Sequence, residues 1–308
     1  MKYILILIFL LSNVMADFNS TKCYIEDTSQ DFRKSATKEF YHMLYGIDSY
    51  FCENDDINIS SYRKIRDSKL QIILSLKDGT KLNVHLRGKI VLPQLKNKAE
   101  LTFSQNDNSE IDNQSAINTN DDVINDKKMH VGLKYYLYRE KKSSAYAKLS
   151  LKTSSPFGPY VKFGIDKNYI NDDFLETTFN HALYYYTNGD ISVSTAVSFF
   201  KPISNDYWLG QGNKLYWEKQ NFYLNNNVLL YQILDLNNRL VYKIGFTTSY
   251  KGNDDGLEHE SFNVSTGFFH RFDKWFFIEA VPRFRKERDN HYDNEFLFTL
   301  NFGMLLGR

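Results

Sequence analysis

The chain has little of several residue types, and each shortage excludes a class of protein. Its 308 residues include only 2 Cys, which excludes a small domain held together by several disulfides. Beyond the N-terminus no apolar run approaches the ~20 residues that a spanning helix needs, so a helical membrane protein is excluded. Lys and Arg number 38 against 37 Asp and Glu. This balance lacks the basic surplus of a nucleic-acid-binding domain, and no nucleic acid is expected as a partner.

Aromatic residues are abundant instead, with 24 Phe, 22 Tyr and 3 Trp. Hydrophobic residues make up 42% of the chain, so it can bury a sizeable core and is not disordered throughout. The length fits one large domain or two small ones.

Residues 1–16 have the features of a secretory signal peptide. Lys2 supplies the positive start, residues 3–11 the apolar stretch, and Val14-Met15-Ala16 a small-residue cleavage site before Asp17. An uncleaved anchor helix is the alternative, but the apolar stretch is too short to span a bilayer. We therefore expect export, with cleavage between Ala16 and Asp17.

Residues 17–66 are expected to form a short N-terminal segment in the periplasm. Between Cys23 and Cys52, residues 31–51 carry apolar side chains at three- and four-residue spacing, which predicts an amphipathic helix. Because the compartment outside the cytoplasm is oxidising, we predict a disulfide between Cys23 and Cys52 that ties the ends of this helix together. A metal or thiol site is not expected, since it would need further Cys or His and only His42 is nearby.

From about Lys69 onwards the hydrophobic pattern has a period of two. In residues 296–306, large apolar side chains at even positions alternate with mostly small or polar ones, and residues 239–250 and 190–200 show the same alternation. This pattern is typical of strands that are wetted on one face. Most segments are about 9–14 residues long, as a tilted bilayer-crossing strand requires, whereas strands of soluble proteins average ~5–6. The segments are 82–91, 98–104, 129–139, 143–152, 158–166, 173–186, 190–200, 207–219, 222–234, 239–250, 259–272, 274–287 and 294–306.

The connections between strands also fit a barrel in a membrane. Residues 187–190 and 235–238 are typical of tight turns, while 252–258 and 289–294 are longer polar loops. Short turns at one end and longer loops at the other are typical of bacterial outer-membrane barrels. Residues 105–128 are rich in Asn, Asp, Ser and Gln and cannot bury enough surface to fold, so we expect a disordered loop there.

Aromatic residues gather near the strand ends, at 184–186, 207–208, 216–217 and 275–277. Tyr and Trp rings settle at the depth of lipid headgroups, so these positions predict two aromatic girdles. A soluble sandwich is the alternative, with shorter strands and a polar outer face. The sequence therefore predicts an all-β fold: a transmembrane antiparallel β-barrel of about 12 strands (range 10–14) over residues 67–308, in the outer membrane of a Gram-negative bacterium.

The segment Trp275-x-Phe277-x-Glu279-x-x-Pro282, followed by a turn with basic and acidic residues, carries a family resemblance. With it, residues from about Leu86 to Gly307 resemble a widespread family of uncharacterised proteobacterial outer-membrane barrel proteins. Relatives carry a second Glu where Val281 stands. The resemblance implies an outer-membrane barrel, and it implies no activity because none is established for the family.

Alternation over residues 274–287 places Glu279, Arg283 and Arg285 on the inward face, behind an apolar face that should meet lipid. Burying an unpaired charge is costly, so these groups should pair with one another, with neighbours such as Lys243, or with water. They form a predicted lumen charge cluster. Such a cluster either sets the ion selectivity of a pore or fills a narrow lumen as an ion-pair plug.

An enzyme is another possibility, and histidines are its candidate bases. Outer-membrane phospholipases carry a compact His-x-Ser-Asn-Gly motif, because hydrolysis needs a hydroxyl within hydrogen-bond reach of an oriented base. His181 is followed by Ala182-Leu183, and His259 has Ser261 but then Phe262-Asn263, so neither completes the motif. No catalytic residue, cofactor or metal is therefore expected.

The leading function is non-enzymatic, either a structural barrel or a narrow pore for small solutes. The alternatives are a lipid hydrolase and a receptor or assembly scaffold whose N-terminal helix docks a periplasmic partner. Outer-membrane lipids and, during biogenesis, the barrel-assembly machinery are the expected partners.

Overall fold

A computed structural model describes most of the chain. The described residues are 34–44, 67–78, 81–92, 95, 98–104, 129–153, 158–170, 175–252, 256–273 and 275–307. Residues 1–16 with the Ala16–Asp17 cleavage site, the cysteines Cys23 and Cys52, and the loop 105–128 lie outside these ranges. The expectations for them stay predictions.

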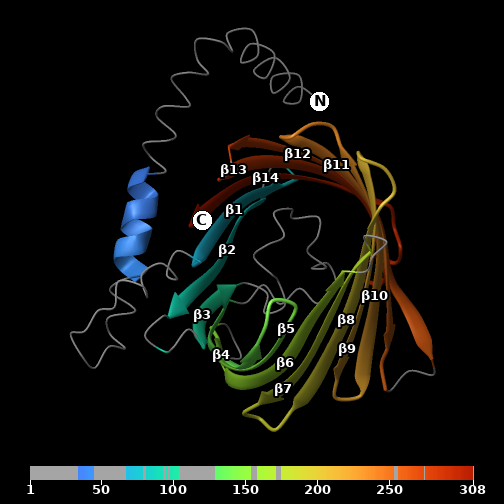
Figure 1. Cartoon of the computed structure of the whole chain (residues 1–308). Helices are drawn as coiled ribbons and strands as arrows, with labels where there is room; N and C mark the ends of the chain where they lie inside the picture. Colours follow the sequence, from blue (N-terminus) through green and yellow to red (C-terminus); the bar gives the residue numbers. More distant parts are fainter. Residues whose placement is uncertain are drawn as a thin grey trace, which may run out of the picture.

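The described chain forms a closed antiparallel β-barrel, in which each strand pairs with the next and β1 pairs with β14 (Figure 1). The strands are β1 (Lys69–Lys77), β2 (Lys81–Leu92), β3 (Ala99–Ser104), β4 (His130–Arg139), β5 (Ser143–Lys152), β6 (Gly158–Ile170), β7 (Glu176–Tyr186), β8 (Ile191–Pro202), β9 (Tyr207–Glu218), β10 (Asn221–Ile233), β11 (Asn238–Tyr250), β12 (Leu257–Asp273), β13 (Phe276–Glu287) and β14 (Glu295–Gly307). A single turn of 3-10 helix, η3 (Arg288–Asn290), joins the last two strands. The predicted fold class is confirmed.

The barrel has 14 strands, at the upper limit of the predicted range rather than at its centre. Sequence alternation missed β1, because Leu70, Ile72 and Leu74 on its outer face flank Ile73 on its inner face and the period of two is obscured. Leu74 lies opposite Phe302 of β14 in the pairing that closes the barrel. Without β1, the strands β2 and β14 would be open edges of the sheet. The pairing of β1 with both strands closes the barrel and removes these edges.

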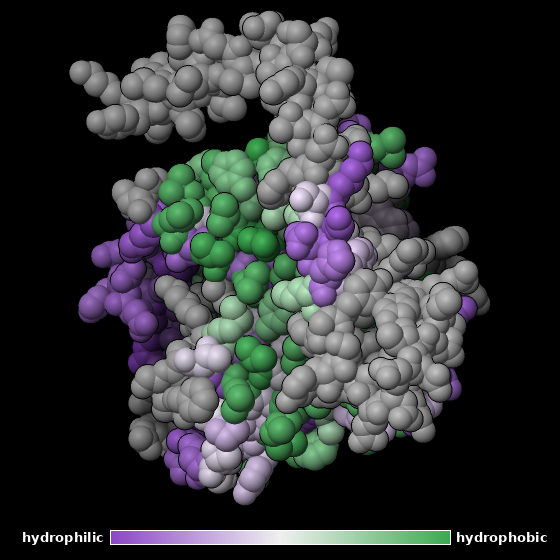
Figure 2. All heavy atoms as spheres, turned by 90° about the vertical axis from the view of Figure 1, so that its left-hand side faces the viewer, coloured by the Kyte–Doolittle hydropathy of each residue, from purple (hydrophilic) through white to green (hydrophobic). Residues whose placement is uncertain are grey.

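The period of two separates an apolar outer wall from a polar inner wall. Outward side chains such as Leu82, Ile165 and Phe298 are exposed, whereas inward Ser192 and Thr247 are buried. On the side of the molecule seen in Figure 2, apolar side chains form a contiguous area that hydrophilic side chains border. The expected outward and inward faces of residues 190–200, 239–250 and 296–306 are confirmed.

The turns differ from the prediction in one respect. We call the end where the chain enters β1 and leaves β14 the terminal end, and the opposite end the loop end. The turn at 187–190 was predicted to lie with the short turns on one side, but β7–β8 and β11–β12 connect at the same, loop end. The connection stays short there because Gly189, at φ 86, allows its N–H to donate to Tyr186 O in a tight turn.

The predicted girdles are also partly wrong. Tyr185 and Trp217 point outward and are exposed, as a girdle requires, but Tyr184, Tyr216 and Trp275 are buried. Consecutive residues of a strand face opposite sides, so a run of aromatic residues cannot supply an outer girdle with every member. Alternate residues of each run instead fill the inner wall.

A helix over residues 34–44 packs on the outside of the barrel at its terminal end (Figure 1). Its Phe40 and Leu44 are buried against the ends of β2, β3 and β14, at Leu92, Ala99 and Leu306. The helix lies within the range predicted for it. Its apolar face is therefore covered by the barrel, which leaves the polar face for any partner. Among the described residues no helix is long and apolar enough to cross a membrane.

The tight turn between β10 and β11 depends on one carboxylate. Asp235 accepts hydrogen bonds from the backbone N–H groups of Asn237 (2.7 Å) and Asn238 (2.9 Å) and from the side-chain amide of Asn238 (2.7 Å). The Asn238 amide and the Asn237 N–H lower the pKa of Asp235. A carboxylate with a lowered pKa stabilises the fold above the unfolded pKa of ~3.9 and loses this contribution as pH falls through the folded value.

We expect Asp235→Ala to lower the denaturant midpoint of unfolding at pH 7, because the variant leaves these donors without their acceptor. The difference from the wild type should shrink as pH falls below ~3.9, because the unfolded chain, where the pKa of Asp235 is not lowered, then binds a proton more readily than the folded one. Unfolding in detergent micelles, followed by Trp fluorescence at both pH values, measures it. Asp206→Ala in the neighbouring β8–β9 turn is the control, and a difference that does not change with pH would contradict the role of the charge.

Candidate functional site: the lumen wall

Three lysines stand side by side on the inner wall of β4, β5 and β6. Lys134 lies directly opposite Lys148, and Lys148 directly opposite Lys162, so that one cation follows another from strand to strand. Adjacent strands are about 4.8 Å apart, which makes this a compact row of like charges. Lys148 and Lys162 are buried. We call Lys134, Lys148 and Lys162 the lysine row.

Tyrosine rings lie beside two ammonium groups of the lysine row, those of Lys134 and Lys162. Lys134 Nζ lies 3.7 Å from the centroid of the Tyr146 ring and 4.8 Å from that of Tyr136. Lys162 Nζ lies 5.0 Å from the centroid of Tyr184. Cation–π contacts of this kind stabilise an ammonium group that has lost water. They hold the ammonium groups of Lys134 and Lys162 against the inner wall.

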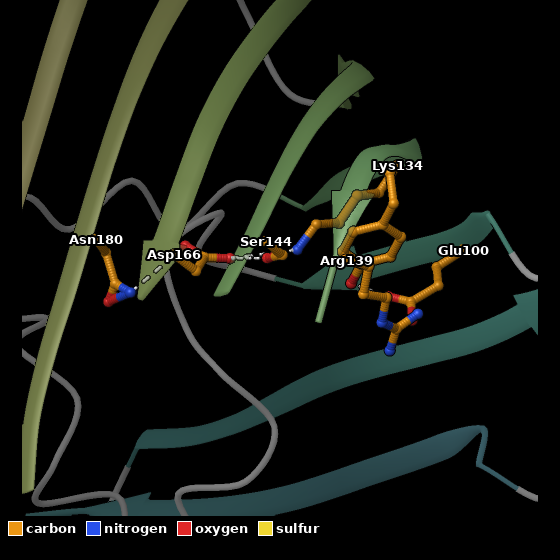
Figure 3. A network of polar contacts seen from close by, with 7 residues as sticks. Glu100, Lys134, Arg139, Ser144, Asp166 and Asn180 are labelled. Carbon is orange, nitrogen blue, oxygen red and sulfur yellow. Dashed lines mark hydrogen bonds and ion pairs between the residues drawn. The ribbon is translucent and has the colours of Figure 1, made fainter. Parts of the chain in front are cut away.

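Two acids, Asp166 and Glu100, lie near Lys134 at one end of the row (Figure 3). Asp166 lies 3.6 Å from Lys134 and accepts hydrogen bonds from Ser144 and Asn180, both at 3.4 Å. Glu100, opposite Lys134 on β3, is engaged elsewhere: it accepts hydrogen bonds from Tyr136 (2.8 Å) and Arg139 (3.0 Å). The acids therefore contact one end of the row and the arginine beside it.

Arg139 reaches the inner wall only through a β-bulge. The register between β4 and β5 shifts between Tyr136 and Tyr138, which inserts one extra residue. Both Leu137 and Tyr138 are exposed on the outside. Strict alternation would have placed Arg139 on the outer wall, and the bulge turns it inward to Glu100.

Glycines make room for the tyrosines. A Cβ atom on Gly164 of β6 would overlap the ring of Tyr146 on the neighbouring strand. The ring therefore lies flat over the glycine and can face Lys134. A Cβ on Gly132 would likewise lie 2.7 Å from Lys148 Cε, so that glycine leaves space for the lysine stem.

We expect Gly164→Ala to destabilise the barrel by about 1–3 kcal/mol, because the added methyl group must displace the Tyr146 ring. The matched control is Gly212→Ala, whose Cβ would meet only Ser198 Oγ at 3.6 Å, an ordinary contact. Denaturant unfolding of both variants in lipid vesicles gives the two free energies. Equal losses at the two positions would show that the ring contact is unimportant.

That Glu279, Arg283 and Arg285 act together as a lumen charge cluster stays a prediction. All three belong to the inward face of β13. Glu279 and Arg285 are six positions apart on the strand, which is about 20 Å. Arg285 lies near the loop end, where it pairs with Glu287 and Glu295, both at 2.7 Å.

Glu279 belongs instead to a buried network nearer the terminal end. Its carboxylate accepts a hydrogen bond from Asn301 Nδ2 at 3.0 Å, and Asn301 Oδ1 accepts one from Ser75 at 2.6 Å. Arg239 lies within electrostatic reach of Glu279 and 4.1 Å from the centroid of the Phe269 ring. The network joins β1, β11, β13 and β14 across the closure of the barrel.

At the loop end, acids and bases alternate. Arg288 of η3 pairs with Glu258 and lies 3.6 Å from Glu260 of β12. Lys251 also pairs with Glu260, at 3.2 Å. With the Arg285 pairs, these contacts form a neutralised rim rather than a row of one sign.

His181 lies on the outer wall of β7, where the sequence offered no partner for it. Its Nδ1 is 2.9 Å from the hydroxyl of Thr195 on β8. Pairing across strands brings the two together, so no local motif could reveal the contact. The ring of Phe179 stacks beside His181 with centroids 6.4 Å apart. Within the described ranges no cluster of three or more His, Cys, Asp or Glu could hold a metal ion.

Sequence reasoning missed the lysine row, although a signal was present. The three lysines follow one another at intervals of 14 residues, from Lys134 to Lys148 and from Lys148 to Lys162. Equal spacing along the chain places residues in one row across neighbouring strands only when the turns between the strands have the matching lengths. The sequence alone did not show where these turns begin and end. The turn lengths needed for that inference came from the fold.

Comparison with known proteins gives likenesses of fold only. No protein-family model and no curated protein matches the chain. Among solved structures, a bacterial polysaccharide outer membrane secretin is 12% identical with a TM-score of 0.43, covering 78% of this chain and 98% of that one. The outer membrane channel DcaP of Acinetobacter baumannii is 11% identical with a TM-score of 0.44, covering 78% and 96%. KdgM porin is 5% identical with a TM-score of 0.38, covering 77% and 98%. At such identities and TM-scores these proteins say nothing of what this chain binds or transports.

Proposed function

We propose that this protein is an outer-membrane β-barrel that forms a narrow pore for small anionic solutes. The observation that carries the proposal is the lysine row, three cations in direct register on one inner wall. Rings of Lys or Arg favour the passage of anions through a pore. The tyrosine rings beside them add flat surfaces on which a solute can rest.

The outer wall supports the membrane placement. Exposed apolar side chains follow one another around the barrel from Leu82 on β2 to Phe298 on β14. Soluble monomers rarely expose contiguous apolar areas above a few hundred Å². A closed barrel with such a wall leaves no backbone hydrogen-bonding group unpaired towards lipid.

The choice between pore and ion-pair plug depends on the order of the charges. A plug places opposite charges next to one another, as the rim does around Arg285 and Glu260. Like charges directly opposite on adjacent strands are destabilising. The lysine row nevertheless places three ammonium groups in register on adjacent strands, as the charged rings that set ion selectivity do. This order of charges supports a pore.

The opposite wall offers neutral hydrogen-bonding groups. Asn225 of β10 donates to Thr247 of β11 at 3.1 Å, and both are buried. On β12 the hydroxyls of Ser261 and Ser265 have no hydrogen-bond partner within the described part of the chain. Polar groups of this kind need water or a solute to satisfy them. Together the two walls suit a hydrated anion.

Planar bilayers test the proposal. Purified protein refolded into a bilayer with a KCl gradient should give steady conductance and a reversal potential of the sign that chloride selectivity produces. A silent membrane, or a reversal potential of the opposite sign, would contradict the anion pore.

A lipid hydrolase is a second candidate, because the His181–Thr195 contact pairs an imidazole with a hydroxyl on the lipid-facing wall. Nucleophilic hydrolysis requires such a pair, with a third group orienting the base. Refolded protein incubated with phospholipid vesicles should then release fatty acid, and His181→Ala should abolish the release. Hydrolysis that survives both His181→Ala and Thr195→Val would exclude this pair as its source.

A further inference from the structure

Polar side chains interrupt the apolar outer wall on four neighbouring strands. Outward-facing positions near the middle of the strands are apolar over most of the barrel, for instance Leu149 on β5, Ile244 on β11 and Phe302 on β14. On β7 to β10 several of the corresponding positions carry hydroxyl, imidazole or amide groups instead. We call these residues the outer polar patch: His181, Thr195, Gln211, Asn213 and Asn226.

The outer polar patch lies at the middle of the wall. His181 is five residues from each end of β7, and Asn226 is five residues from the start of β10. Asn213 of β9 lies directly opposite Asn226. Their outward direction follows from the buried inward neighbours on the same strands, such as Asn225 and Lys214. Two amides thus stand side by side at mid-depth.

These groups are costly against hydrocarbon. An amide moved from water to an apolar medium without a hydrogen bond is disfavoured, because lipid tails neither donate nor accept. His181 and Thr195 satisfy each other in part at 2.9 Å. The side-chain amides of Asn213 and Asn226 make no such contact with the described residues. A protein surface with amides or hydroxyls at the same depth would satisfy them.

We propose that the outer polar patch is the contact surface for a second copy of this chain. The proposal rests on the membrane placement argued above. Every copy enters the membrane in the same orientation, so a symmetry axis along the membrane normal brings the patch of one copy to the patch of the next at equal depth. Side-chain amides both donate and accept, which makes the patch complementary to itself. Polar groups of this kind hold membrane-embedded segments together.

Site-specific crosslinking tests the contact in cells. A photoreactive amino acid at Gln211, inside the patch, should yield a product of twice the chain mass in outer-membrane fractions. The same group at Phe302, outward on β14 and at a similar depth, is the matched control and should not. Products from both positions, crosslinks to lipid alone, or crosslinks to a different protein would each overturn the proposal.

Substitution of the amides gives an independent readout. In the Asn213→Leu/Asn226→Leu variant, self-association measured by sedimentation in detergent should weaken by about tenfold. This is the loss expected when a hydrogen bond between two membrane-embedded segments is removed. Thr266→Leu on the outer face of β12 is the control, with unchanged association. Association unaltered by the double substitution would overturn the proposal.

Failure of the membrane placement can be distinguished from failure of the contact surface. Heat-modifiable migration of the full chain in outer-membrane fractions reports the membrane barrel, and it should persist in every variant. A protein absent from these fractions overturns both the membrane placement and the contact surface. A barrel present in them but monomeric overturns the contact surface alone.

Discussion

Reversing two charges of the lysine row, in the Lys148→Glu/Lys162→Glu variant, is expected to convert an anion-favouring pore into a cation-favouring one. Both side chains lie on the inner wall, next to each other in register. Two unit charges 4 Å apart interact by about 1 kcal/mol even in bulk water and by more beside a protein, so the permeability ratio should change by about tenfold or more. No comparable change is expected from residues on the outer wall.

The reversal potential in planar bilayers under a KCl gradient measures this ratio, and its sign should invert. Lys167→Glu is the matched control, since Lys167 belongs to the same strand as Lys162 but is exposed on the other face. It should leave the sign unchanged. The milder Lys162→Gln should shift the potential in the same direction by less, and heat-modifiable migration shows that each variant has folded. An unchanged potential in the folded double variant would refute the role of the lysine row.

Removing the carboxylate of Glu279 is expected to have the largest effect on stability. Glu279 is fully buried, accepts a hydrogen bond from Asn301 and lies within electrostatic reach of Arg239. In Glu279→Ala, the arginine loses a compensating charge and the Asn301 amide loses its acceptor. Breaking a buried charge network from one side costs about 3–5 kcal/mol.

Denaturant unfolding in lipid vesicles measures the loss. Glu279→Gln keeps an acceptor for Asn301 and removes only the charge, so it should be less destabilising than Glu279→Ala. The matched control is Glu295→Ala at the rim, where the partly exposed pair with Arg285 should contribute less than about 1 kcal/mol. Similar losses at positions 279 and 295 would contradict the buried network.

The prediction from sequence was most accurate where the alternation of side chains alone sets the face of a strand residue. Residues 296–306 and 239–250 face inward and outward as their alternation indicates, because a pleated strand sends neighbouring side chains to opposite sides. The same rule placed Glu279, Arg283 and Arg285 on the inner face. It failed at β1, where the inward Ile73 between outward Ile72 and Leu74 obscures the alternation, and at Arg139, where a bulge reverses the faces.

The helix illustrates a second limit. Its amphipathic pattern was readable, and residues 34–44 are helical within the predicted range. What its apolar face contacts was not readable, because that surface is assembled from the ends of β2, β3 and β14. These ends become neighbours only when the barrel closes.

By itself, therefore, the sequence determined the class of fold and the face on which most strand residues lie. Only the tertiary structure decided which residues lie next to one another: Lys148 and its lysine neighbours, Glu279 and Asn301, His181 and Thr195, and Asn213 and Asn226. Alternation fixes the face of a residue but not its register with the next strand. Register is set by turn lengths, bulges and the closing pair of strands, which are properties of the whole barrel.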